Sequence, residues 1–179
     1  MPPFFLRAVR RLSVCLAALT CFLQPAAAAA TAERLGGAGW TMNVPDGYAH
    51  AYEDEGRTIV LTPPSPERFL LRFTYHSLKD YVGERPRVGR EFIEHLAAKK
   101  RLTTFSVDGN GGVAYVEPPV VTEQDGGRIQ ESAGSLGLDD AYVTFTVVVD
   151  QAALTDPVVQ ELLRSGLPVL LGRIRSLDG

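Results

Sequence analysis

The feature that most constrains the fold is the nine-residue segment AYVTFTVVV at residues 141–149. Its alternate positions are apolar, and successive side chains of a β-strand point to opposite faces of a sheet. One face of this strand is therefore predicted to meet an apolar core. Tyr142 and Val148 on the other side indicate that the second face is partly covered too. The residues predicted to face the core are Ala141, Val143, Phe145, Val147 and Val149.

Further segments have the composition of strands and are separated by turn residues. Pro45-Asp46-Gly47 and Pro63-Pro64 end two of them, and the glycine-rich run at residues 108–112 is a hairpin signal. The first segment places Trp40, Met42 and Val44 on one face. Strands are predicted at residues 40–44, 58–62, 69–75, 103–107, 113–117, 120–124 and 128–132.

Helices are predicted in two parts of the chain. Residues 90–100 place four apolar side chains on one face, those of Phe92, Ile93, Leu96 and Ala97. Near the C-terminus, Asp156 suits a helix cap and Pro157 a first helical residue, and Gly166 is expected to end that helix. Another helix is expected from Pro168, with its apolar spacing reaching Leu177. This order of elements predicts an α+β fold, an antiparallel sheet flanked by helices as an α/β/α sandwich.

The first thirty residues are predicted to lie outside this fold. Three arginines precede the apolar run LSVCLAALTCFL, and a run of alanines follows Pro25. This order is typical of a cleaved secretory signal peptide, with cleavage expected near Ala28 to Ala30. The apolar run is shorter than the roughly 20 residues that span a bilayer. A lipoprotein anchor at Cys21 is the alternative, although Thr20 is a poor match for the small residue expected before it.

Removal of the signal would leave a single domain at residues 40–179, preceded by a mobile polar leader at residues 31–39. Both cysteines, Cys15 and Cys21, lie within the signal, so the mature domain has no thiol chemistry or disulfide. Without the three signal arginines, 15 of the 18 basic residues remain against 21 acidic ones, a net charge of about −6. We therefore expect a periplasmic or secreted protein with no stable membrane anchor and no nucleic-acid partner.

Residue patterns for catalysis or metal binding are weak. The three histidines, His50, His76 and His95, are far apart, whereas a zinc site needs several converging ligands. Asp108 and Asn110 match only half of a calcium loop, and Ser135 has Ala133 where a nucleophile elbow has its first glycine, with no helix behind it. The sequence thus predicts no catalytic residue, no metal and no cofactor.

The stretch SLKDYVGERPRVG at residues 77–89 is the best candidate for a functional surface. Lys79, Tyr81, Arg85 and Arg87 form a basic and aromatic island on an acidic chain. Arginine and tyrosine are enriched at protein interfaces, and long loops on rigid scaffolds often carry function. We therefore predict that these four residues bind another protein.

The segment WTMNVPDGY at residues 40–48 resembles the opening strand of PsbP-like and Mog-like domains. The helix around residues 92–99, the strand at residues 142–149 and the closing IRSL of residues 174–177, taken as the end of a helix, are also similar to that architecture. The resemblance implies an α/β/α sandwich used mainly to bind proteins: photosystem II in plants, Ran in eukaryotes, and partners of DcrB-like exported proteins and secretion-effector chaperones in bacteria. It implies no site residues.

The expected function is therefore that of an exported, non-catalytic domain that binds a protein. Three alternatives stay open on the sequence alone. The chain could be an immunity protein that neutralises a periplasmic toxin or effector, a carrier of a small ligand in an apolar pocket, or a hydrolase whose site is not recognised.

Overall fold

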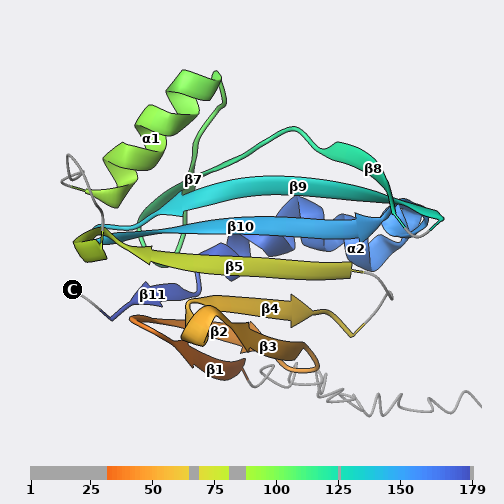
Figure 1. Cartoon of the computed structure of the whole chain (residues 1–179), viewed down its shortest axis with the longest axis horizontal. Helices are drawn as coiled ribbons and strands as arrows, with labels where there is room; N and C mark the ends of the chain where they lie inside the picture. Colours follow the sequence, from red (N-terminus) through yellow and green to blue (C-terminus); the bar gives the residue numbers. More distant parts are fainter. Residues whose placement is uncertain (1–31, 65–68, 81–87, 125, 178–179) are drawn as a thin grey trace, which may run out of the picture.

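The computed structural model describes residues 32–64, 69–80, 88–124 and 126–177. These residues form two antiparallel sheets, and helices lie on both faces of the larger one (Figure 1). The α+β class predicted from the sequence, with an antiparallel sheet flanked by helices, is confirmed.

The larger sheet contains eight strands. Seven follow the order β3-β4-β5-β10-β9-β7-β6, and β8 also pairs with β9, at the end of that strand that β7 does not reach. Every pairing is antiparallel. The strands are β3 (Ala49–Glu53), β4 (Thr58–Thr62), β5 (Phe69–Ser77), β6 (Phe105–Val107), β7 (Gly112–Val116), β8 (Val120–Gln124), β9 (Gly127–Gly137) and β10 (Ala141–Asp150).

The pairing of β5 with β10 forms the middle of this sheet. Phe73 lies opposite Phe145 and Leu71 opposite Val147, and the two phenylalanine rings are 6.3 Å apart between centroids. All core-facing residues of both strands are at most 3% exposed. Burying each large apolar side chain stabilises the fold by about 1.5–3 kcal/mol. The alternation predicted for residues 69–75 and 141–149 is confirmed.

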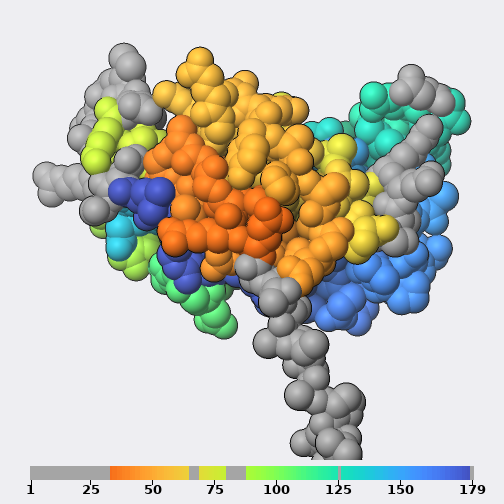
Figure 2. Space-filling view, turned by 90° about the horizontal axis from the view of Figure 1, so that it is seen from below, coloured from red at the N-terminus to blue at the C-terminus, as the bar shows by residue number. Residues whose placement is uncertain are grey.

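The smaller sheet has three strands in the order β1-β2-β11 and packs against the core face of the larger one. Its strands are β1 (Ala32–Gly37), β2 (Trp40–Pro45) and β11 (Ile174–Ser176). Trp40, Met42 and Val44 are buried as predicted, at 2% exposure or less. Figure 2 shows the N-terminal strands, in orange, between C-terminal segments, in blue, on this side of the molecule.

The predicted mobile leader at residues 31–39 is wrong for most of its length. Residues 32–37 are strand β1, paired with β2, and Leu35 is 2% exposed in the core. A segment with two adjacent glycines and one large apolar side chain carries no strand signal of its own. This segment is ordered by its pairing with β2 and by burial of the Leu35 side chain in the core.

Strand β3 was not predicted either, since all five of its residues are exposed and it lacks an apolar alternation. It is joined to β4 by the short 3-10 turn η1 (Asp54–Gly56). Strand β9 is longer than predicted and includes Ser135 in its regular pairing with β10. Ser135 therefore does not lie on a strand-to-helix turn, and the nucleophile-elbow alternative is excluded.

Helix α1 (Gly89–Lys100) agrees with the predicted helix and covers the outer face of the sheet, the face opposite the main core. Ile93 and Ala97 are buried against Tyr115 of β7, with Phe92 and Leu96 packed beside them. Lys100, in the last turn, pairs with Glu117 and lies 5.7 Å above the Tyr115 ring.

The C-terminal helical run lies on the core face. It consists of α2 (Pro157–Glu161), the π-helical turn η4 (Leu162–Gly166) and α3 (Leu167–Leu171), and a 3-10 turn, η3 (Gln151–Thr155), leads into it. The Asp156 carboxylate accepts a hydrogen bond of 2.8 Å from the Val158 amide, so the predicted cap is confirmed. Gly166 does not end the helix, because its backbone is right-handed helical. The Leu167 amide instead bonds to the Leu162 carbonyl, five residues back, and this wider turn lets the helix continue past Pro168.

The predicted helix to Leu177 is also wrong beyond residue 171. Residues 174–176 form β11, which pairs with β2. Ile174 is buried, as its helical spacing with Leu170 and Leu171 suggested, but strand pairing with Met42 places it there. Leu177 is 54% exposed.

Two turns far apart in sequence are bound tightly together. One is the β6–β7 hairpin turn at residues 108–111, and the other is the segment between α3 and β11. The Asn110 side-chain amide donates to the carbonyls of Leu171, at 2.8 Å, and Ile174, at 3.2 Å. Arg175 donates to the carbonyls of Gly109, at 2.9 Å, and Gly172, at 2.7 Å. We call this arrangement the two-turn clamp.

The clamp brings two backbones into contact at Gly172. A Cβ atom at this position would lie 2.0 Å from the Asp108 carbonyl oxygen. Replacing Gly172 by alanine must therefore push the turns apart, and we expect a loss of about 1–3 kcal/mol in the free energy of unfolding. Chemical denaturation measures this loss directly.

Gly36→Ala is the matched control, because nothing lies within 4 Å of a Cβ atom there. A Gly172→Ala variant as stable as Gly36→Ala would contradict the close approach of the two turns.

Candidate functional site

The structure places the predicted binding residues at one end of the larger sheet. Lys79 lies in the short 3-10 turn η2 (Leu78–Asp80) that follows β5, and it is exposed. Tyr81, Arg85 and Arg87 lie outside the described residues. The structure therefore brings Lys79 to the sheet edge, and the grouping of the four residues stays a prediction.

The two ends of this loop are fixed to the β9–β10 turn. The Leu78 amide donates to the Asp140 carbonyl at 3.0 Å, and the Gly89 amide donates to the Asp139 carbonyl at 3.2 Å. Leu78 is 1% exposed, and a Cβ atom on Gly89 would lie 2.1 Å from the Ala141 carbonyl oxygen. Arg90 of the first turn of α1 pairs with the Asp139 carboxylate at 2.7 Å. The loop thus starts and ends on a closely packed base.

An aromatic stack joins the same two ends on the outer face of the sheet. His76, two residues before Leu78, stacks on Tyr142 of β10 with ring centroids 4.6 Å apart. Phe92 of α1 packs on Tyr142 at 5.2 Å. The His76 Nε2 atom lies 3.2 Å from the Thr144 hydroxyl. Burial, and secondarily the positive charge of Arg57, lower the pKa of His76 below its usual value of 6.5.

A histidine that contacts a hydroxyl group can act as the base that activates a catalytic nucleophile. The contact of His76 with Thr144 therefore has to be considered as a possible catalytic pair. In the described residues no carboxylate holds the second ring nitrogen of His76, which a catalytic base needs for orientation. Ser176 forms a second polar chain: its hydroxyl donates to the Asp140 carboxylate at 2.7 Å and lies 2.8 Å from the Tyr75 hydroxyl. Both arrangements hold strands together.

A row of hydroxyl side chains crosses the outer face beside the stack. Thr58, Thr74, Thr144, Ser135 and Tyr115 lie directly opposite one another on β4, β5, β10, β9 and β7. Helix α1 covers Tyr115 and η1 lies over Thr58, so Thr74 and Thr144 are the half-exposed members. Sequence reasoning missed this row, because each threonine looks ordinary until the register of all five strands is known.

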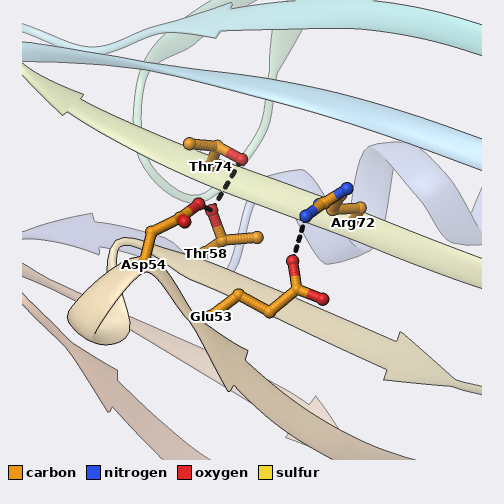
Figure 3. Close-up of polar contacts among 5 residues, drawn as sticks. All are labelled: Glu53, Asp54, Thr58, Arg72 and Thr74. Atoms are coloured by element: carbon orange, nitrogen blue, oxygen red, sulfur yellow. Dashed lines mark hydrogen bonds and ion pairs between the residues drawn. The ribbon is translucent and has the colours of Figure 1, made fainter.

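The acidic turn η1 closes one end of the hydroxyl row (Figure 3). Thr58 donates to the Asp54 carboxylate at 2.9 Å, and the Thr58 and Thr74 hydroxyls are 2.9 Å apart. Beside them Arg72 pairs with Glu53. Asp54 has a left-handed backbone (φ 51°), which is uncommon for a residue other than glycine, and its bond with Thr58 helps to hold this conformation.

The other polar residues that could bind a metal or act in catalysis do not form a centre. Glu91 and His95 are exposed on α1, Asn110 is used in the two-turn clamp, and Asp139 and Asp140 point to different partners, Arg90 and Ser176. Over the part of the chain that the structure describes, no three histidine, cysteine, aspartate or glutamate residues gather as metal ligands would. Nor does any described helix have the length and apolar character needed to cross a membrane.

Comparisons with known proteins are informative for the fold only. The sequence matches no protein-family model, and no curated protein matches it in sequence. A crystal structure from Bacteroides thetaiotaomicron VPI-5482 has a similar fold, with a TM-score of 0.55 and 9% identity over 82% of this chain. The chain spans about half of that protein, 48% of its length.

The solution structure of cyanobacterial PsbP (CyanoP) from Synechocystis sp. PCC 6803 is also among the matches. It has 10% identity over 84% of this chain and 95% of that one, with a TM-score of 0.37. A score this low carries no argument about function. Membership of the PsbP-like or Mog-like family stays a prediction from the sequence.

The half-buried histidine of the stack gives a test by pH. The unfolded chain protonates His76 as the pH falls through about 6.5, whereas the folded protein protonates it only at lower pH. The free energy of unfolding should therefore decrease as the pH falls below about 6.5, with a slope of at most about 1.4 kcal/mol per pH unit from this group. His76→Gln should remove that part of the slope in denaturant titrations between about pH 5.5 and 7.

His95→Gln, which replaces an exposed histidine of α1, is the control for this measurement. A slope that persists unchanged in His76→Gln would show that another group is responsible.

Proposed function

We propose that this chain is an exported, non-catalytic protein that binds another protein through the end of the sheet at which loop 77–89 begins and ends. The observation that carries the proposal is the fixed base of this loop. Its two ends are hydrogen-bonded to the β9–β10 turn and joined by the stack of His76, Tyr142 and Phe92. A rigid support limits the entropy lost when a loop binds a partner.

The charge of this surface also supports the proposal. Lys79 is exposed there, and Arg85 and Arg87 follow it in a chain with more acidic than basic residues. A basic island of this kind suits a partner with an acidic patch, which it would attract by complementary charge. The export that we propose rests on the N-terminal sequence, with its three arginines, apolar run and alanines.

Capture of a partner from a periplasmic extract tests this function. The double variant Arg85→Ala with Arg87→Ala should weaken binding of the captured, repurified protein by about tenfold or more, since interface arginines often contribute over 1 kcal/mol each. Lys79→Ala should weaken it less, because exposed lysines contribute little to interface energy. Calorimetric titration with the purified partner gives the affinities.

Arg34→Ala with Arg164→Ala is the matched control, because it removes the same charge from exposed positions on β1 and η4. All variants should keep the melting temperature of the parent. Equal binding by the loop variant and the control would refute the proposed surface. The captured protein would also show whether the partner is a toxin, as an immunity role requires.

A further inference from the structure

A hollow of about 360 Å³ borders the two-turn clamp. Its walls come from the β6–β7 turn, with Asp108 and Gly109, and from the end of the C-terminal helical run, with Pro168, Val169, Gly172 and Arg173. This volume is in the lower part of the range found for small-molecule sites.

The walls of this hollow are held in place before any ligand arrives. Asn110 and Arg175 tie the two turns together through three side-chain to backbone hydrogen bonds, and the backbones touch at Gly172. Arg175 also donates to the Gly172 carbonyl of its own segment. The lining is mainly apolar, and the Val169 side chain is 54% exposed. When an apolar group covers a fixed apolar surface that is open to water, the free energy of the system falls.

Two opposite charges lie on the same hollow. Asp108 and Arg173 both line it, and within the described residues neither side chain has a hydrogen-bond or ion-pair partner. Burial raises the pKa of the Tyr48 phenol above its usual value. The positive charge of Arg173 acts on the same phenol and opposes part of this rise. Charges of both signs beside an apolar wall match a small ligand that carries both signs and an apolar group.

We propose that this hollow binds a free amino acid with an aliphatic side chain. The Arg173 guanidinium takes the carboxylate, for which its planar fork of donors is suited, and the Asp108 carboxylate takes the ammonium group. The aliphatic side chain covers Val169 and Pro168. This site lies on different residues from the protein-binding surface proposed above, and neither proposal depends on the other.

Calorimetric titration of the purified protein with leucine and two analogues tests each contact separately. Leucinamide keeps the ammonium but loses the carboxylate, and N-acetyl-leucine does the reverse. Arg173→Gln should weaken leucine and N-acetyl-leucine by about tenfold or more and leave leucinamide unchanged, because a lost charge-assisted bond costs at least that factor. Asp108→Asn should weaken leucine and leucinamide and leave N-acetyl-leucine unchanged.

Glycine, which has no side chain to cover Val169, should bind at least about tenfold more weakly than leucine to the parent protein. Arg164→Gln and Glu94→Gln remove the same charges from exposed positions outside the hollow and should bind leucine as the parent does. Absence of leucine binding at millimolar concentration would overturn the proposal. Leucine affinity unaltered by both Arg173→Gln and Asp108→Asn would do so as well. Equal melting temperatures show that the variants are folded.

Discussion

The pairing of β5 with β10 is the interaction on which the other layers depend. Its core face supplies the phenylalanine and valine side chains against which the smaller sheet and the C-terminal helical run pack. Its outer face carries Tyr142 and Thr144, which meet α1 and the hydroxyl row. A slip of one residue in this register would exchange the two faces, exposing the phenylalanines and burying threonines. The nine paired positions therefore fix both the core and the outer surface.

The base of loop 77–89 and the two-turn clamp lie where the chain leaves the sheet and the C-terminal helical run. β5 stops at the end of the sheet where β10 starts, and α1 begins close to the same place. The base of loop 77–89 is formed there, where Leu78 and Gly89 both bond to the β9–β10 turn. On the core face, the helical run must pass Pro168 and then turn back into β11, and the two-turn clamp stabilises that reversal. Both sites are thus places where the backbone changes direction under tight restraint, which makes them suitable for presenting side chains in fixed positions.

Strands and helices with a regular spacing of apolar residues could be predicted from the sequence. Strands that are ordered mainly by pairing with a neighbouring strand could not. β2, β5, β10 and α1 have alternating or helical spacing with large apolar residues, and Trp40, Phe73 and Phe145 are buried as expected. β1, β3 and β11 are short, rich in small or exposed residues, and ordered by their neighbours. The apolar spacing at residues 167–177 could not distinguish a helix from a helix followed by a buried strand, because Ile174 is buried in either case.

The candidate surfaces show the same division. Composition alone indicated the basic loop as a candidate, and of its four candidate residues the described part of the chain includes only Lys79, which is exposed. The hydroxyl row and the hollow beside Val169 depend on register and on contacts between residues over sixty positions apart, such as Asn110 with Leu171. No local pattern could have shown them.

The position of β2 between β1 and β11 has a consequence for the order of folding. Trp40 lies opposite Ser176, so the smaller sheet cannot be completed until residues 174–176 are available to pair with β2. Contacts of such long sequence separation raise the contact order, and folding slows as contact order rises. A smaller sheet that waits for β11 leaves β2 incompletely paired until late in folding. Removing the few residues of β11 would leave β2 with an unpaired edge and uncover Trp40 and Met42 at the same time.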